Sequence, residues 1–493
     1  MALSNYKSYG ASCWRYLRRR SSFVKLFLFC VALFFSMLIF KGEIRILVLS
    51  KEVRYVDATE SERRPISSPF TLLRESLSKP SKNPPHIYHA SKQLKRKLPS
   101  FTIKESPGPL TYLNMTPIAQ EQERRAELLK NSCQGNEDRY QGLSSKKWAL
   151  ERIEVNTNSQ LVYCPLLKVG STFWRRIFYA LRTKTTIHTP YDISIKTALS
   201  PNPNRKNLKD LLVTNDSWRF VEEASRIMYI REPYARLLSG YTDKLFAPNP
   251  FFWSIIGRYI IRNFRFNATE TSKRCGHDVT FPEFVKYVIY TEEYNKTERD
   301  GHFTPAYDQC KPCQVQYNII GKMETFIQDT SFVMNKIGFN VSKELLKEWA
   351  NKAEEDAIFD STASPFSWKK GISKCMSMYQ AGKRIWRKMQ IRGVVDKKIP
   401  LPFGTHNMNS VSSTNFIKAL IMSRKKSEHN RTKQKREALI DAFSQVSLED
   451  KLKLKELYSP DFELFGYDPE PKDLFETPDR RTFRTKYFNL NGV

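Results

Sequence analysis

The chain is poor in acidic residues relative to basic ones. Its 493 residues include 51 aspartates and glutamates but 81 lysines and arginines, so its formal charge at pH 7 is +30. An excess of this size predicts an anionic partner, and the candidates are nucleic acid, an anionic membrane and a polyanionic glycan. Charge alone does not choose among them.

Motifs that mark several enzyme classes are missing. The chain has no Asp-x-Asp motif, which argues against a metal-dependent glycosyltransferase, and no Gly-Lys-Ser/Thr triplet, so it has no Walker loop. One Cys-x-x-Cys pair is present, at Cys310 and Cys313, but no second such pair completes four zinc ligands. We therefore expect no metal site.

Two short segments carry the clearest chemistry. In the first, an apolar run at 161–167 predicts a buried strand, a Gly-Ser-Thr turn lies at 170–172, and 173–181 has a helical pattern. Free amides at the helix start, a lysine and two hydroxyls would supply charge and donors, and the glycine lets the backbone approach a ligand. This arrangement predicts a cradle for the phosphate of a nucleotide. Its candidate residues are Lys168, Val169, Gly170, Ser171 and Thr172.

The second segment repeats the arrangement 63 residues later. A short apolar strand at 227–230 ends at Arg231, Pro233 opens a helix, and Ser239 lies further along that helix. The planar guanidinium group of arginine suits bidentate bonds to phosphate oxygens. Arg231 and Ser239 are therefore candidates to share one phosphate, and the two segments together predict a split phosphate site.

The amino terminus predicts a membrane anchor. Residues 23–40 form an apolar run interrupted only by Lys25 and Ser36. As a helix it would span about 27 Å, enough for a thin secretory-pathway bilayer. Basic residues before the run, and the lack of a small-x-small cleavage site after it, favour an uncleaved anchor with 1–22 in the cytoplasm. A cleaved signal peptide is the alternative, and either reading argues against nucleic acid as the partner.

Cysteines and glycosylation sequons agree with a luminal location. Six of the eight cysteines follow the anchor, and an even number in an oxidising compartment predicts disulfide bonds, with fifteen possible connectivities. Six Asn-x-Ser/Thr sequons add modest support. They begin at Asn114, Asn215, Asn267, Asn295, Asn340 and Asn430.

Composition divides the luminal part of the chain. Residues 41–145 are polar, basic and rich in proline, which predicts a partly extended, poorly packed stem with a helix near 121–130. A catalytic domain is expected over 146–470, followed by a tail at 471–493. Within that domain, the basic clusters of 369–436 are either solvated surface or a track for an acidic glycan.

The two phosphate-site segments resemble those of a known family. The pattern Cys, three residues, Lys-Val-Gly-(Ser/Cys)-Thr-x-Trp-(Lys/Arg)-Arg is similar to Cys164–Arg176. The pattern Val-Arg-Glu-Pro-Phe-x-Arg-Leu-x-Ser-Ala-Phe is similar to Ile230–Tyr241. Both belong to the Golgi carbohydrate sulfotransferases, which modify chondroitin, dermatan and related glycans.

Further blocks in the family's order extend the resemblance over about 160–467 of this chain. The chain departs from the family at Leu167, where proline is usual, at Phe173, where asparagine is common, and at Phe303, where tryptophan is common. The further blocks are Phe281–Val285, His302–Phe303, Cys310–Cys313, Ile320–Glu324 and Leu457–Tyr467.

The resemblance implies a fold, a reaction and a set of roles. The fold would be α/β, with a central, mainly parallel sheet, a P-loop-like 5′-phosphosulfate loop and flanking helices. The co-substrate would be 3′-phosphoadenosine 5′-phosphosulfate (PAPS), without a metal, and the acceptor an acidic glycan or glycoprotein hydroxyl in the Golgi lumen. Lys168 would contact the bridging oxygen and 5′-phosphate, and Ser171 and Thr172 would add donors. Arg231 and Ser239 would hold the 3′-phosphate.

The attacking hydroxyl also needs a base, and histidine fits because its unperturbed pKa lies near neutrality. Seven histidines are available. His188 follows the first helix at a distance that would return the chain to the sheet edge, and His302 belongs to a shared block. We expect His188 to be the base and His302 to be a substrate-side or structural residue.

Two other functions stay open. One is another Golgi type II enzyme, a glycosyltransferase, although the missing Asp-x-Asp motif speaks against it. The other is a non-catalytic, membrane-anchored glycan-binding protein that keeps the fold, because Leu167 changes the entry to the first loop. The oligomeric state is left open.

Overall fold

The computed structural model describes residues 116–476, apart from 137, 143, 145, 201–204, 213–216, 295–298 and 340, and also residues 487–489. The expected cytoplasmic tail, the anchor at 23–40 and most of the stem lie outside the described residues. Within the described part, no helix is both long and apolar enough to cross a membrane. Four of the six sequons also lie outside it, at Asn114, Asn215, Asn295 and Asn340.

Five strands form one sheet in the order β3-β1-β2-β4-β5. The three longest strands, β2, β4 and β5, run parallel to one another, whereas β1 and β3 pair antiparallel. Burial of both faces explains the continuous apolar runs in β2 and β4. The prediction of an α/β fold with a mainly parallel sheet is confirmed in this coarse form. The strands are β1 (Glu154–Asn156), β2 (Leu161–Cys164), β3 (Lys206–Asn207), β4 (Ser225–Ile230) and β5 (Ile319–Lys322).

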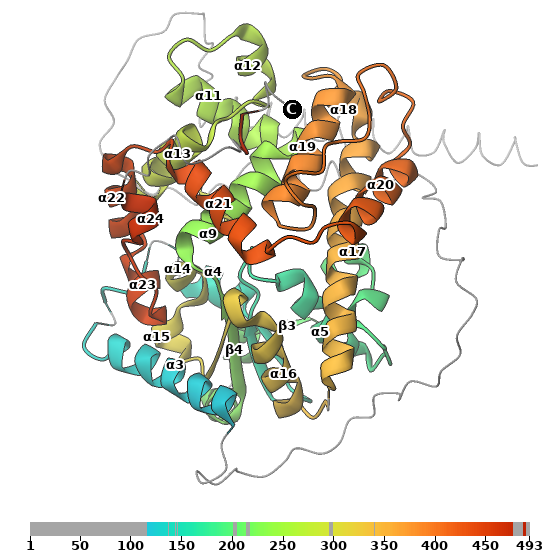
Figure 1. The fold of residues 1–493 in the computed structure, drawn as a ribbon. Helices are drawn as coiled ribbons and strands as arrows, with labels where there is room; N and C mark the ends of the chain where they lie inside the picture. The colour runs from blue at the N-terminus through green and yellow to red at the C-terminus, as the bar shows by residue number, and fades with distance from the viewer. Residues whose placement is uncertain are drawn as a thin grey trace, which may run out of the picture. The chain divides into compact units, whose positions relative to one another are not determined.

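Helices surround the sheet and extend beyond it (Figure 1). Those up to the end of the sheet are α3 (Pro117–Cys133), α4 (Lys146–Arg152), α5 (Ser171–Thr183), η2 (Pro190–Asp192), α6 (Ile195–Leu199), α7 (Leu208–Leu211), α8 (Ser217–Glu223), α9 (Pro233–Tyr241), η3 (Thr242–Phe246), α10 (Pro250–Phe252), η4 (Trp253–Gly257), α11 (Arg258–Phe264), α12 (Glu270–Cys275), α13 (Phe281–Glu293), α14 (Ala306–Cys310) and α15 (Pro312–Val315). After β5 come η5 (Met323–Thr325), α16 (Phe326–Lys336), α17 (Lys343–Ser367), α18 (Lys369–Ile372), α19 (Met378–Ile391), α20 (Ser413–Lys425), α21 (Arg431–Phe443), α22 (Leu448–Leu457), α23 (Ser459–Phe465) and α24 (Lys472–Phe475).

Helix α3 comes from the end of the segment expected to be stem, and it contains the helix predicted at 121–130. It packs on β5. Arg125 donates from Nη1 to the carbonyl of Ile320 at 2.8 Å and forms a buried ion pair with Asp329 at 3.0 Å. Gln122 accepts from the amide of the same Ile320 at 2.9 Å. This part of the expected stem is therefore packed against the sheet rather than extended.

The basic segment 369–436 is folded rather than a loose insert. It forms α18, α19, α20 and the start of α21, and Figure 1 shows α18 to α20 beside the long helix α17. Ile385, Met389 and Phe416 from this segment share a buried apolar cluster with Trp253 and Ile358. The segment therefore carries its own core and is anchored to the rest of the described chain.

The basic clusters of this segment are divided between ion pairs and surface. Arg424 and Arg431 both pair with Glu354 of α17, and Arg436 pairs with Asp473. Lysines 425, 426 and 433 are exposed. The expected glycan track stays a prediction, and it would depend on the exposed lysines.

Three disulfides join the six cysteines, as predicted for an oxidising compartment. Two of them use the Cys-x-x-Cys pair, so Cys310 and Cys313 are each tied to a different cysteine rather than to a metal. One bridge links the end of β2 to α14, and another links the basic segment to α12. The pairs are Cys133–Cys313, Cys164–Cys310 and Cys275–Cys375.

Candidate functional site

The first predicted loop lies at the carboxyl end of β2. Lys168 and Gly170 have left-handed backbone conformations, with φ of +71° and +80°. A Cβ atom at position 170 would lie 2.9 Å from the ring of Phe326, so glycine is required both by conformation and by space. Helix α5 begins at Ser171, and its first free amides are therefore available at the loop.

The second predicted loop lies beside the first. Because β2 and β4 are parallel neighbours, their carboxyl ends meet at the same edge of the sheet. Arg231 follows β4 directly, and Glu232 caps α9 by accepting from the amides of Tyr234 and Ala235 at 3.0 and 2.7 Å. Ser239 lies on the same helix. The structure thus brings together the two segments that the sequence singled out.

Arg231 has charged groups of both signs around it. Arg392 and Lys435 lie within its electrostatic reach, and so do the carboxylates of Glu232 and Glu324. Both carboxylates have other bonds, because Glu232 caps α9 and Glu324 accepts from the Glu232 amide at 3.1 Å. Within the described residues, the side chains of Arg231 and Ser239 make no hydrogen bond. They are free to bind an anion.

Lys168 belongs to a cluster of three lysines around one carboxylate. Its Nζ lies 2.7 Å from Oδ2 of Asp243, and Nζ of Lys388 lies 2.7 Å from Oδ1 of the same side chain. Lys244 approaches Oδ2 at 3.2 Å. Burial alone would raise the pKa of Asp243, but the three lysines hold that pKa well below its usual value. The cluster therefore carries an excess of positive charge.

The pKa of Lys168 is lowered to about 8. Burial is the main cause, because it disfavours the charged form, and the positive charges of Lys244 and Lys388 act in the same direction. Asp243 opposes both effects. Lys168 is consequently protonated at neutral pH but loses its charge under mildly alkaline conditions.

His302 lies next to this lysine cluster. Its Nδ1 is 2.5 Å from Oδ1 of Asp300, and its ring edge meets the ring of Phe252 at a centroid distance of 5.5 Å. Nζ of Lys244 lies 4.9 Å over that same ring. Burial lowers the pKa of His302 below its usual value, and Asp300 offsets only part of this effect. A neutral ring must place its proton on Nδ1, since a carboxylate only accepts, which leaves Nε2 as an acceptor.

Helix α9 also contacts the His302 segment. A Cβ atom at Gly240 would lie 2.8 Å from the ring of Phe303 and 3.2 Å from the carbonyl of His302. The small residue after Ser239 therefore lets the histidine segment pack directly against the helix of the second loop.

His188 lies apart from these groups. Its side chain is exposed, its amide donates to Asp192 at 2.8 Å, and its carbonyl accepts from Nε1 of Trp349 at 3.2 Å. None of its described contacts reaches Lys168 or His302. The structure thus places His302, and not His188, beside the first loop.

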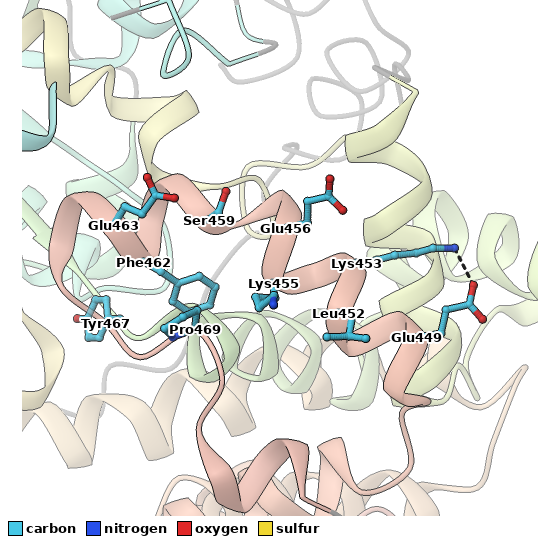
Figure 2. A pocket seen from close by; sticks show the side chains of 10 residues that line it. All are labelled: Glu449, Leu452, Lys453, Lys455, Glu456, Ser459, Phe462, Glu463, Tyr467 and Pro469. Atoms are coloured by element: carbon cyan, nitrogen blue, oxygen red, sulfur yellow. Dashed lines mark hydrogen bonds and ion pairs between the residues drawn. The ribbon is translucent and has the colours of Figure 1, made fainter. Parts of the chain in front are cut away.

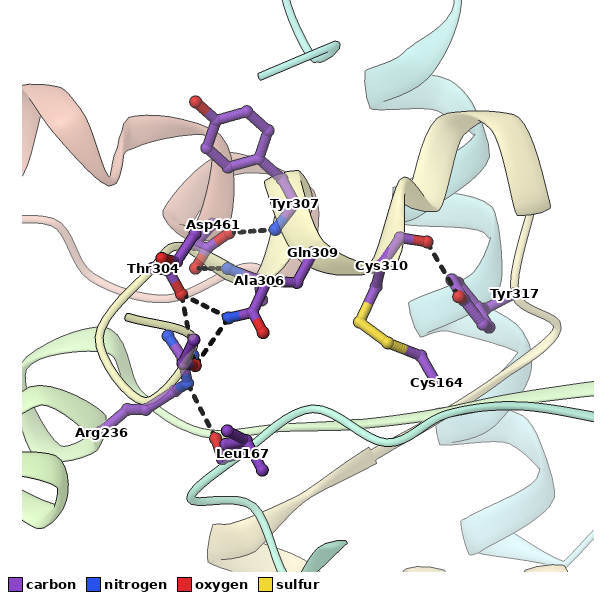
Figure 3. The surroundings of a disulfide bond; sticks show 11 residues. Cys164, Leu167, Arg236, Thr304, Ala306, Tyr307, Gln309, Cys310, Tyr317 and Asp461 are labelled. Atoms are coloured by element: carbon purple, nitrogen blue, oxygen red, sulfur yellow. Dashed lines mark hydrogen bonds between the residues drawn. A yellow bond between two sulfur atoms is a disulfide. The ribbon is translucent and has the colours of Figure 1, made fainter. Parts of the chain in front are cut away.

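Arg236 connects the first loop, the second helix and the His302 segment. Its Nε donates to the carbonyl of Leu167 at 3.1 Å, and its Nη2 donates to the carbonyl of Thr304 at 2.8 Å (Figure 3). Gln309 donates to the same Thr304 carbonyl at 2.8 Å. Position 167 thus contributes its backbone carbonyl, which proline would offer equally, so the departure from the family pattern costs no hydrogen bond here.

Sequence reasoning missed Asp243, Lys388 and Asp300. Asp300 could have been found from the spacing Asp-x-His, which allows a carboxylate to orient a nearby ring. Asp243 and Lys388 are 145 residues apart, and no local pattern links them. Their pairing depends on how α19 packs against η3.

A separate surface groove runs along α22 and α23 and holds none of the predicted site residues (Figure 2). Its lining mixes both charges with apolar side chains such as Leu452 and Phe462. Glu449 and Lys453 pair across one turn of α22 at 3.0 Å. Nothing in this lining resembles the anion site at the sheet edge.

Comparison with known proteins agrees with the geometry. Residues 151–383 match the profile of a family described as "Sulfotransferase family". Carbohydrate sulfotransferase 11 of Rattus norvegicus is 31% identical over 190 residues, which are 38% of this chain and 53% of that protein. Carbohydrate sulfotransferase 14 of Danio rerio is 30% identical over 193 residues (39% and 50%), and carbohydrate sulfotransferase 8 of Mus musculus is 27% identical over 227 (45% and 51%). The chain spans about half the length of these relatives, and no solved structure matches it.

Proposed function

Because this chain belongs to the carbohydrate sulfotransferase family, we propose that it transfers a sulfuryl group from PAPS to a hydroxyl of a glycan. The observation that carries the proposal is the pair of anion loops at neighbouring parallel strand ends. Lys168 lies at one loop, and Arg231 and Ser239, whose side chains make no hydrogen bond within the described residues, lie at the other. Two anion-binding loops at neighbouring strand ends suit a nucleotide with phosphate groups at both its 5′ and 3′ positions.

Sulfuryl transfer would proceed by in-line displacement, in which residues of the first loop have separate roles. The acceptor oxygen forms a bond to sulfur, while the bond from sulfur to the 5′-phosphate oxygen breaks and that oxygen keeps the electron pair. Lys168 would neutralise the charge that develops on this oxygen, and the amides of Ser171 and Thr172 would bind the phosphate. No redox change occurs, and 3′-phosphoadenosine 5′-phosphate (PAP) is the leaving group.

We assign the base to His302 in place of His188. A base must lie within hydrogen-bond reach of the hydroxyl that it deprotonates, and His302 is the histidine beside the lysine cluster. Asp300 would hold the ring with Nε2 directed to the acceptor and stabilise the imidazolium that forms. His188 would then have no direct part in the chemistry.

The acceptor and the compartment complete the proposal. The relatives are carbohydrate sulfotransferases, and the charge of +30 favours an acidic glycan or glycoprotein of the chondroitin or dermatan type. Three disulfides fit the oxidising lumen of the secretory pathway. We propose a Golgi enzyme anchored by residues 23–40, with its catalytic region in the lumen.

The direct test is transfer of labelled sulfate from PAPS by the full-length protein. Desulfated chondroitin, desulfated dermatan and glucuronyl-terminated oligosaccharides form the acceptor panel, and at least one is expected to be labelled. PAP binding without labelling would instead indicate a non-catalytic glycan-binding protein. Absence of both would reject the proposed function.

Replacing Arg231 with alanine is expected to weaken PAP binding roughly 10- to 100-fold, the usual cost of one hydrogen-bonded charge pair. Adenosine 5′-monophosphate lacks the 3′-phosphate, so its affinity should change little. Titration calorimetry with both nucleotides measures the difference. Arg262→Ala, which removes an exposed arginine of α11, is the matched control. An equal loss for both nucleotides would remove Arg231 from the 3′-phosphate site.

A further inference from the structure

A side chain from the basic segment 369–436 reaches the first anion loop. Lys388 lies on α19, and only 5% of its side chain is exposed. The match to the family profile ends at residue 383, five positions before Lys388. Its ammonium group and that of Lys168 bind the two oxygens of one carboxylate, that of Asp243. The carboxylate of Asp243 thus bridges the two lysines.

The position of Lys388 is fixed by packing on both sides. The neighbouring residues Ile385 and Met389 lie in the buried cluster that joins α19 to Trp253. Arg384, one turn earlier, donates from Nη1 to the carbonyls of Phe246 and His277 at 3.3 and 2.5 Å. The Cys275–Cys375 bridge ties the start of the segment to α12. The lysine is therefore held at the loop by rigid neighbours.

The local charges are unbalanced. Lys168, Lys244 and Lys388 surround Asp243 at 3.2 Å or less, which leaves an excess of two positive charges among groups in direct contact. Asp300 and Asp360 also act on Lys244, but neither forms an ion pair with any of the three lysines, so they offset the excess only in part. Three of the four side chains in the cluster are only partly exposed, at 16–23%, and Lys388 is buried, so an excess of positive charge here favours binding of an anion.

We propose that Lys388 binds the phosphosulfate group of the donor together with Lys168, and that Asp243 is the counter-ion that the donor replaces. This rests on the proposed function and adds a residue to it. A phosphosulfate group carries one negative charge on its phosphate and one on its sulfate, so it has the sign of charge that the lysine cluster lacks. The basic segment is then part of the donor site, not only a surface for the acceptor.

The alternative is that Lys388 only neutralises Asp243. A double-mutant cycle distinguishes the two roles, because they predict different donor affinities for the double variant. Lys388→Met alone weakens donor binding in both cases, because it also leaves Asp243 less well neutralised near the donor. If Lys388 binds the donor, adding Lys388→Met to Asp243→Asn removes a ligand of the donor and weakens donor binding. If Lys388 only neutralises Asp243, the added substitution leaves donor binding unchanged. This double variant leaves no unpaired buried carboxylate, so it avoids the main cause of misfolding.

The test measures the KM for PAPS and the affinity for PAP at about pH 6, which favours protonated lysines. We expect the KM for PAPS of the double variant to be roughly 10- to 100-fold higher than that of Asp243→Asn, whereas the KM for the acceptor stays unchanged. Lys388→Arg in the wild-type background should retain most of the donor affinity. Lys370→Met, which removes an exposed lysine of the same segment, is the matched control.

Equal KM values for Asp243→Asn and the double variant would overturn the role of Lys388 and leave the proposed function standing. If the wild-type protein neither binds PAP nor transfers sulfate, the proposed function fails, and the role of Lys388 fails with it. The two failures are therefore distinguished by the wild-type protein alone.

Discussion

Replacing Lys168 with methionine is expected to lower kcat for sulfate transfer by about 1000-fold. The ammonium group lies at the loop where charge develops on the leaving phosphate oxygen, and removing one such stabilising donor costs about 100- to 1000-fold in other enzymes. Methionine resembles the aliphatic part of the lysine side chain and lacks its charge. The measurement is single-turnover transfer of labelled sulfate at saturating PAPS. A loss of less than about tenfold would remove Lys168 from the chemistry.

The same residue is expected to set the alkaline limb of the pH profile. Lys168 must be protonated to act, and its pKa is about 8, so kcat/KM should fall as pH rises through that value. Arginine stays charged at all accessible pH values, so the limb should move upward in Lys168→Arg. Asp243 raises the pKa of Lys168, so Asp243→Asn should move the limb below pH 8. A limb that stays in place in both variants would belong to another group.

Replacing His302 with alanine is expected to lower kcat by about 100- to 10,000-fold, the range of general base catalysis. The base must be neutral, and burial lowers the pKa of this ring, so full activity should extend below the usual histidine value of about 6.5 before the acid limb begins. The kcat of the variant and the acid limb of the wild-type profile are the two measurements.

His188→Ala is the matched control for the base. Its side chain is exposed, and its described bonds use backbone atoms, so this variant should keep kcat within about threefold of the wild-type value. Asp300→Asn should lower kcat less than His302→Ala, because it disturbs the orientation of the ring but leaves the ring in place. A larger loss in His188→Ala than in His302→Ala would restore His188 as the base.

The sequence was sufficient to predict the two loops and their proximity, because a strand, a tight turn and a helix start are all local signals. The parallel pairing of β2 with β4 then follows from the α/β class, and it places Lys168 and Arg231 at one edge. The choice between His188 and His302 could not be made in this way. Which histidine reaches the loop depends on the packing of the His302 segment on α9 at Gly240.

The charge cluster and the disulfides were also beyond sequence reasoning. In the sequence, nothing distinguishes Lys388 from the other cations of the basic segment. Its partner, Asp243, is identified only by the packing of α19 against η3. The observed set of three bridges is one of the fifteen connectivities that six cysteines allow, and the sequence did not distinguish among them. Both depend on contacts between residues 100 or more positions apart.

The Cys164–Cys310 bridge cannot form until residue 310 has been synthesised. Cys164 lies four residues before Lys168, and its partner is made 146 residues later. The first loop therefore emerges during synthesis well before the cysteine that braces its strand. A nascent or truncated chain ending before 310 contains both anion motifs but lacks this support. The bridge that braces β2 consequently forms only after Cys310 has been synthesised and both cysteines have been oxidised.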